Sequence, residues 1–131
     1  MVLDTSALLA LLLDEPEAEA FCLAVEEDAT RLVSAASLLE TAIVIEARKG
    51  EAGGRELDLL IHKAGVTVFA VDADQVSEAR RAYRRFGKGR HAAGLNFGDV
   101  FAYALARTSG EPLLFKGDDF AKTDIRRVAQ P

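Results

Sequence analysis

The chain has 131 residues, a net charge of −5, one cysteine and hydrophobic residues at half of its positions. Its apolar runs are shorter than the roughly 18 residues that a membrane span needs, and a negative chain is poorly suited to coating nucleic acid, because such binding rests on a positive field. One thiol can form neither an internal disulfide nor a cysteine metal cluster. We therefore expect a reducing, cytoplasmic setting and no membrane partner.

Short apolar runs alternate with amphipathic stretches along the chain, and the two patterns predict strands and helices respectively. In chain order we expect a strand over 2–4, helices over 7–13 and 16–28, a strand over 31–35, helices over 37–48 and 53–64, a strand over 66–71, helices over 72–86 and 99–108, and a strand over 112–115. The pattern over 125–128 also permits a final short strand.

Two of these helices carry expectations about packing. Gly53 and Gly54 are expected to open the helix over 53–64, since glycine commonly marks an element boundary. The helix over 72–86 is amphipathic, and its spacing predicts that Val76, Ala79 and Tyr83 point inward.

Strands that alternate with helices at this spacing predict an α/β fold, in which a parallel sheet is flanked by helices on both faces. No repeat or linker divides the sequence, so we expect one domain over residues 1–131. Ligands of such open sheets bind beyond the carboxyl ends of the strands, where the strand order reverses. The search for chemistry therefore begins at that edge.

Acidic residues occupy several positions expected at this edge. Asp4 ends the first strand, Asp118 and Asp119 follow the strand over 112–115, and Asp99 opens the helix before that strand. Acids that are far apart in sequence are thus predicted to lie near one another.

Glu40 interrupts an apolar run over 38–45, and a carboxylate on a mostly buried helix needs a partner such as a cation. Ser37 and Glu40 also match a capping box, and Asp4 and Asp99 could serve as helix caps or favour the positive end of a helix. Together, however, neighbouring carboxylates repel one another, and a cation among them relieves that repulsion.

A site of this composition favours one class of metal and one class of reaction. Oxygen ligands without a histidine or cysteine cluster favour Mg²⁺ or Mn²⁺ over Zn²⁺. Such a cation binds phosphodiester oxygens and lowers the pKa of a bound water. The carboxylates can also accept the proton of that water.

Three segments resemble those of a known family: MVLDTSAL over 1–8, LNFGDVFAYALA over 95–106 and LLFKGDDF over 113–120. They resemble the corresponding segments of PIN domains, with Glu40 in its expected helix. Their order, spacing and total length are similar to those of VapC-type toxins from bacterial type II toxin–antitoxin pairs, over essentially the whole chain.

The resemblance implies a PIN-like, three-layer α/β/α fold and a Mg²⁺- or Mn²⁺-dependent endoribonuclease toxin that acts as a homodimer. It also implies a cognate VapB-type antitoxin that blocks the active groove. By position, Asp4 and Asp99 would bind the metal directly and Glu40 would support them. Many relatives carry a final Thr-x-Asp pattern, and this chain departs from it, which leaves Asp118 and Asp119 as rival fourth acids. We prefer Asp119.

A basic segment offers a contact for the RNA substrate. Between Arg80 and His91 the chain carries six lysine or arginine residues and no acid. The candidate RNA contacts within it are Arg84, Arg85, Lys88 and Arg90. The same pattern is also typical of a solvated helix face that runs into a loop.

Two other functions compete with the ribonuclease. A phosphatase of the haloacid dehalogenase class also begins with an aspartate at a strand end, but its chemistry requires a second aspartate two residues later, where this chain has Ser6. A catalytically silent PIN-like binding module is the second alternative. Silent members generally lose acids, whereas this chain keeps all of the candidates.

Overall fold

The middle layer of the fold is a parallel sheet of four short strands. The computed structural model describes residues 1–129, so the last two residues of the predicted domain lie outside the described part. The strands are β1 (Val2–Leu3), β2 (Leu32–Ser34), β3 (Thr67–Phe69) and β4 (Leu113–Leu114), in the order β3-β2-β1-β4. Because the chain runs outward from β1 to β3 and then returns to β4, the order reverses beside β1, where open parallel sheets bind ligands.

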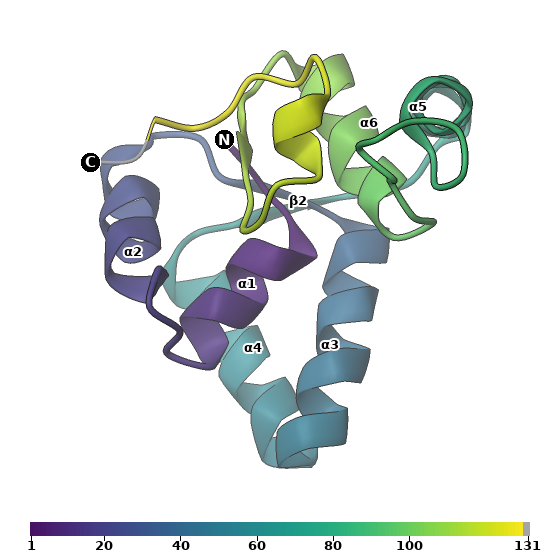
Figure 1. Ribbon diagram of the computed structural model, residues 1–131. Coiled ribbons are helices and arrows are strands. Elements are labelled where there is room, and N and C mark those ends of the chain that lie inside the picture. Colours follow the sequence, from purple (N-terminus) through teal and green to yellow (C-terminus); the bar gives the residue numbers. More distant parts are fainter. Residues whose placement is uncertain (130–131) are drawn as a thin grey trace.

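Helices cover both faces of this sheet (Figure 1). The helices are α1 (Thr5–Leu12), α2 (Ala18–Glu27), α3 (Ala35–Lys49), α4 (Glu51–Lys63), α5 (Ala73–Phe86) and α6 (Asp99–Ser109), and a 3₁₀ turn, η1 (Phe120–Lys122), follows β4. Successive residues of a strand face opposite sides. Val2 accordingly packs into a core with α5 and α6, and Leu3 into a second core with α1 and α2. The predicted three-layer α/β/α fold is confirmed.

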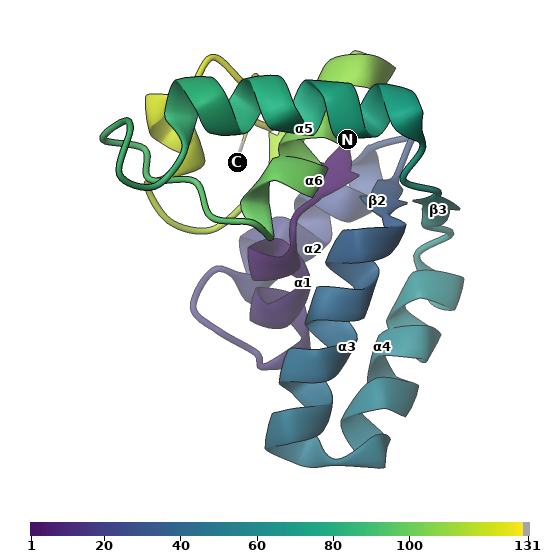
Figure 2. The ribbon, with the colours of Figure 1, turned by 90° about the vertical axis from the view of Figure 1, so that its right-hand side faces the viewer.

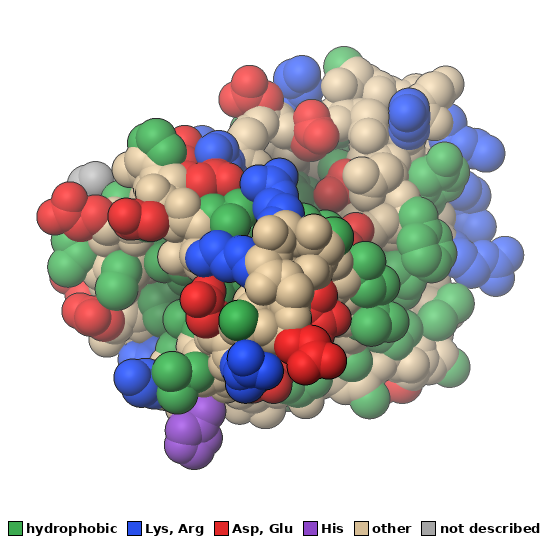
Figure 3. Space-filling view, turned by 90° about the horizontal axis from the view of Figure 1, so that it is seen from below, with side chains coloured by type: hydrophobic (Ala, Val, Ile, Leu, Met, Phe, Trp, Pro, Cys, Tyr) green, Lys and Arg blue, Asp and Glu red, His purple; other side chains and the backbone are tan. Residues whose placement is uncertain are grey.

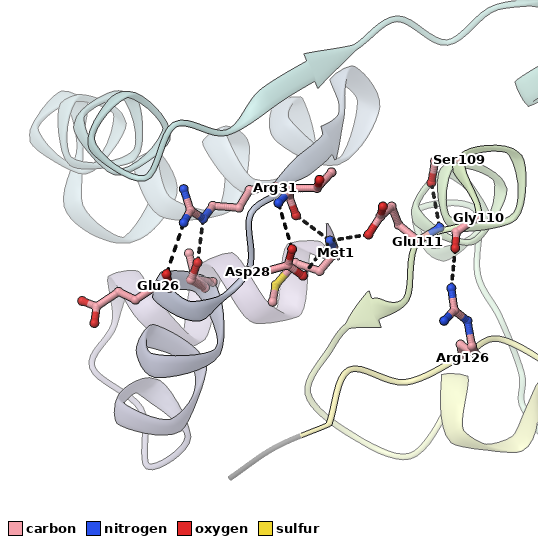
Figure 4. Close-up of polar contacts among 10 residues, drawn as sticks. Met1, Glu26, Asp28, Arg31, Ser109, Gly110, Glu111 and Arg126 are labelled. Carbon is pink, nitrogen blue, oxygen red and sulfur yellow. Dashed lines mark hydrogen bonds and ion pairs between the residues drawn. The ribbon is translucent and has the colours of Figure 1, made fainter.

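Polar contacts fix the central strand between its two neighbours (Figure 4). The amino group of Met1 donates to Asp28 Oδ2 at 3.0 Å, to the Thr30 carbonyl at 2.5 Å and to Glu111 Oε2 at 2.8 Å. Asp28 and Thr30 precede β2, whereas Glu111 precedes β4. These contacts therefore hold the register of β1, and with it the position of the residue at its far end.

At the edges of the sheet, β3 is exposed and the strand that the sequence permits over 125–128 is not formed. The side chains of β3 are exposed along the whole strand, because β3 lies at the edge of the sheet. The segment predicted as a final strand over 125–128 forms only an isolated bridge between Leu113 and Arg127. Among residues 1–129, no helix is both long and apolar enough to cross a membrane.

The inward stripe predicted for α5 is only partly buried. Ala79 is 7% exposed, but Val76 and Tyr83 are 45% and 36% exposed. The prediction that all three point into the core was wrong, because α5 packs chiefly against α6 rather than flat on the sheet. An apolar strip of α5 therefore faces outward.

The glycine pair lies inside α4, not at its start. Helices α3 and α4 run side by side as a hairpin (Figure 2). A Cβ atom on Gly53 would lie 2.7 Å from the Ile45 carbonyl oxygen, whereas one on Gly54 would meet the flexible end of the Glu46 side chain. The glycines thus permit close approach of two helices. The prediction that they open the helix was wrong.

Substitution of the two glycines should have opposite effects. Gly53→Ala should destabilise the chain by about 1–3 kcal/mol, because its methyl group meets backbone that cannot move aside. Gly54→Ala is the matched control and should be neutral or stabilising by up to about 1 kcal/mol, because alanine has the higher helix propensity. Urea unfolding of both variants measures the difference. Equal stability of the two would contradict this account of the hairpin.

Candidate active site

Asp4 lies at the carboxyl end of β1 and caps α1. Its side chain is 4% exposed, and Oδ2 accepts hydrogen bonds from the Ser6 backbone N–H at 3.0 Å and the Ser6 hydroxyl at 2.6 Å. Burial raises the pKa of Asp4 to about 6, the Ser6 hydrogen bonds oppose that rise, and the charges of Asp99 and Glu40 add to it. Asp4 therefore caps α1, as one alternative predicted, and the same side chain is the candidate site residue.

Glu40 reaches the same region from α3. The capping alternative is wrong, because Ser34 caps α3 and accepts from the Ala36 N–H at 3.3 Å, which places Ser37 inside the helix. A Cβ atom on Gly98 would lie 2.8 Å from the Glu40 carboxyl carbon. Because residue 98 is glycine, the segment before α6 can approach this carboxylate closely.

Asp99 occupies the first turn of α6 and is held by Asn96. The Asn96 N–H donates to Asp99 Oδ2, and the Asp99 N–H donates to Asn96 Oδ1, each at 2.9 Å. Burial raises the pKa of Asp99, the hydrogen bond from Asn96 lowers it, and the charges of Asp119 and Glu40 raise it further. Asp99 thus combines a reciprocal hydrogen-bonded contact with Asn96 and a place among the acids.

The two rival acids after β4, Asp118 and Asp119, differ in their effect on Asp99. Both are exposed, and Gly117 before them adopts a positive φ of 99° at the turn. Among the described residues, Asp119 is the member of the pair whose charge raises the pKa of Asp99. This placement supports the preference for Asp119, although its role stays a prediction.

The four acids influence one another without forming a finished coordination shell. Among residues 1–129, no three acidic, histidine or cysteine side chains converge closely enough to hold an ion as they stand. Hydrogen bonds instead engage one oxygen of Asp4 and one of Asp99. The donor set consists of carboxylate oxygens, which fits a hard divalent cation.

Ser6 and Asn96 are the polar partners of two of the acids, and of the two only Asn96 was not a candidate from the sequence. The Ser6 hydroxyl donates to Asp4 and accepts from the Lys116 N–H at 3.0 Å, so it ties the first acid to the segment that carries Asp119. The signals were present, as a serine two residues after Asp4 and an asparagine three residues before Asp99.

A family model described as PIN domain matches residues 1–126. The chain belongs to the PIN domain family. Ribonuclease VapC30 of Mycobacterium tuberculosis H37Rv is 66% identical over 131 residues, which span all of both chains. Ribonuclease VapC of Mycolicibacterium smegmatis is 64% identical over 128 residues. The match covers 98% of this chain and 99% of that protein.

Solved structures share the fold of this PIN domain. The crystal structure of M. tuberculosis VapC20, described as a toxin that cleaves the sarcin–ricin loop, superposes with a TM-score of 0.80 at 20% identity and covers 99% of this chain and 98% of its own. VapBC2 from Rickettsia felis, bound to a promoter DNA fragment, has a TM-score of 0.77 at 12% identity, covering 99% and 98%. Membership of the PIN family removes the phosphatase alternative.

The PIN domain does not gather the four predicted RNA contacts into one set. Arg84 lines an open groove between α5 and α6. Arg85 instead pairs with Asp124 at 3.0 Å. Lys88 and Arg90 are exposed in the loop after α5. The role of all four in RNA binding stays a prediction.

Neutralising Asp4 should stabilise the metal-free chain. Because the folded-state pKa of Asp4 is raised from 3.8 to about 6, the folded state binds the proton more tightly than the unfolded state. The contribution of Asp4 to stability is therefore lost as pH rises through about 4 to 6. At pH 7 in EDTA, Asp4→Asn should raise the free energy of unfolding by up to about 3 kcal/mol.

Thermal unfolding across pH 4–8 measures this effect, and the gap between Asp4→Asn and wild type should widen as pH rises. Asp118→Asn is the control, since Asp118 is exposed, and it should follow the wild type. A destabilised Asp4→Asn variant at pH 7 would show that the carboxylate is satisfied within the protein alone.

Proposed function

We propose that this PIN domain is a Mg²⁺- or Mn²⁺-dependent endoribonuclease that hydrolyses RNA phosphodiester bonds. The observation that carries the proposal is the cluster of acids around Asp4, whose pKa is raised chiefly by burial and further by the charges of Asp99 and Glu40. Several relatives at 64–66% identity are named as ribonucleases, which supports RNA as the substrate.

Asp4 and Asp99 would hold the cation, and Glu40 and Asp119 would support it. Ser6 fixes the Asp4 carboxylate through Oδ2, and Asn96 fixes Asp99 through its own Oδ2. When bound, the cation would polarise a phosphate oxygen and lower the pKa of an attacking water.

The chain's own groups supply the remaining requirements of hydrolysis. Asp119 is exposed and near Asp99, so its carboxylate can accept the proton of the attacking water. Lys88 and Arg90 can attract the RNA backbone. Arg84 belongs to the proposed RNA contacts as well, and Arg85 is the weakest of them because Asp124 already neutralises its charge.

RNA cleavage under controlled divalent cation tests the proposal. The purified chain should cleave labelled RNA with Mg²⁺ or Mn²⁺ and stop in EDTA. Asp4→Asn and Asp99→Asn should each lower kcat/KM by more than about a hundredfold. Removing a residue that only hydrogen-bonds to a metal ligand already costs up to about a hundredfold, and loss of a ligand itself should cost more. Undiminished cleavage by both variants would refute the metal site.

The adjacent acids provide a matched pair for the same assay. Asp119→Asn should lower kcat/KM strongly and Asp118→Asn should leave it close to wild type, because Asp119 is the acid that acts on Asp99. The reverse order would assign the fourth position to Asp118. A wild-type chain without metal-dependent cleavage would support the silent binding module.

The proposal includes a toxin role, in which a cognate VapB-type antitoxin blocks the active groove and the chain acts as a homodimer. Expression of the wild type in a bacterial host should arrest growth, and coexpression of the small gene product encoded beside it should relieve the arrest. Asp99→Asn, expressed at an equal level, should not arrest growth. Arrest by Asp99→Asn would show that toxicity does not come from RNA cleavage.

A further inference from the structure

Residues 116–119, which we call the acidic turn, connect β4 to η1 and carry both rival acids. Phe120, the first residue of η1, is 3% exposed, and its ring packs on Phe115 with the centroids 5.2 Å apart. Between the two ends, Gly117 has a φ of 99° and the aspartates after it are exposed. Phe120 therefore fixes the far end of the acidic turn, and the near end depends on Lys116.

Lys116 holds the near end of the acidic turn through its backbone and through its side chain. The Lys116 N–H donates to the Ser6 hydroxyl oxygen at 3.0 Å, so the turn lies beside the start of α1 (Figure 1). The Lys116 ammonium pairs with Glu15 and, at 3.3 Å, with Glu17. Both glutamates lie in the loop between α1 and α2. Lys116 thus joins the acidic turn to that loop.

The pairing of Lys116 with the two glutamates differs from an ion pair on the open surface, which contributes little. The side chains of Lys116, Glu15 and Glu17 are only 38%, 28% and 37% exposed. Glu17 Oε2 is buried and accepts no hydrogen bond among residues 1–129, where Lys116 is the one cationic group within 4.0 Å of it. Burial of such an oxygen is costly unless an opposite charge lies beside it. Glu17 and Lys116 therefore need each other.

The loop that carries the glutamates is itself firmly held. The Glu15 N–H donates to the Ala10 carbonyl at 3.0 Å, and the Ala18 N–H donates to the Glu15 carbonyl at 2.9 Å. Asp14 has a φ of 50°, and a residue with a Cβ atom keeps such a conformation only where its surroundings hold it. A side chain bound to this loop is therefore bound to a fixed part of the fold.

We propose that Lys116 is a positioning residue, which holds the acidic turn against Glu15 and Glu17 so that Asp119 stays beside Asp99. A lysine near a nuclease site could instead bind a substrate phosphate. Two carboxylates already offset the charge of Lys116, however, and leave it little attraction for RNA. The placing of Asp119 for catalysis rests on the proposed ribonuclease function, whereas the attachment of the turn does not.

Backbone ¹⁵N relaxation of the metal-free chain tests the attachment without reference to cleavage. Lys116→Met removes the cation, and Glu15→Gln/Glu17→Gln removes the charges of its partners. In both variants the order parameters of the amides at 117–119 should fall from about 0.85 to below about 0.6, while those of α1 stay unchanged. Unchanged order parameters at 117–119 would overturn the proposal, whether or not the chain cleaves RNA.

Glu56→Gln is the matched control for the loss of an ion pair. Glu56 pairs at 3.1 Å with Lys49, which is 38% exposed, as Lys116 is. This pair joins α4 to the end of α3, and Figure 3 looks onto the tip of that hairpin, where acidic and basic side chains lie side by side. Glu56→Gln should leave the acidic turn as rigid as in the wild type. Equal loosening by this control would contradict a specific role of Lys116.

Cleavage kinetics at saturating Mg²⁺ test the consequence for the site. Lys116→Met and Glu15→Gln/Glu17→Gln should each lower kcat by at least about tenfold, because a displacement of about 1 Å can cost about a hundredfold. The KM for RNA should stay within about twofold, since neither variant removes a contact with RNA. Lys116→Arg should keep most of the wild-type kcat, because a guanidinium also pairs with carboxylates.

A direct contact between Lys116 and RNA predicts a different pattern. Lys116→Met would then raise KM, whereas Glu15→Gln/Glu17→Gln would free the lysine and lower KM. That pattern, or a loss of kcat in Lys116→Arg as large as in Lys116→Met, would overturn the positioning role. A wild-type chain that does not cleave RNA would refute the proposed function, and the relaxation measurement would still decide the attachment of the turn.

Discussion

The Asp4 carboxylate is 4% exposed at the end of the central strand, and a charged group in such a place must be matched by hydrogen bonds or by opposite charge. Ser6 supplies two hydrogen bonds, but they leave the pKa at about 6. Two further acids, Asp99 and Glu40, add repulsion instead of relief. The fold thus maintains an unfavourable charge at the point where its strand order reverses, and a bound cation would remove the cost.

The surrounding elements are arranged to tolerate that charge. Helices α1 and α6 both begin at the acids, so the positive ends of two helix dipoles face the same region. Gly98 lets the start of α6 approach the Glu40 carboxylate. The contacts of the Met1 amino group hold β1 between β2 and β4, so the backbone that carries Asp4 is fixed from its other end.

Strand and helix periodicity was sufficient to predict the layers of the fold and the edge at which Asp4 and Asp99 meet, because those depend on local pattern and on the geometry of parallel sheets. Features that depend on how closely two elements approach were missed. Position 53, inside α4, requires glycine because a Cβ atom there would collide with the carbonyl oxygen of Ile45. Val76 is exposed because α5 packs chiefly against α6. No single segment of sequence contains both partners of such contacts.

The acids likewise include features that local sequence cannot predict, because they depend on contact between two elements. Glu40 matches a capping pattern in sequence, and only the position of Ser34 at the start of α3 shows that the pattern is not used. The choice between Asp118 and Asp119 likewise depends on their distance from a residue on another element, which local sequence does not contain.

Anomalous scattering from a crystal of the wild-type chain grown with Mn²⁺ tests the central claim most directly, because it locates the cation independently of catalysis. The account predicts a peak between the carboxylates of Asp4 and Asp99, with Glu40 and Asp119 around it, and its loss in Asp99→Asn. A Mn²⁺ peak elsewhere would contradict the assignment of the four acids to one cation site. The absence of a peak between these carboxylates at saturating Mn²⁺ would contradict it as well.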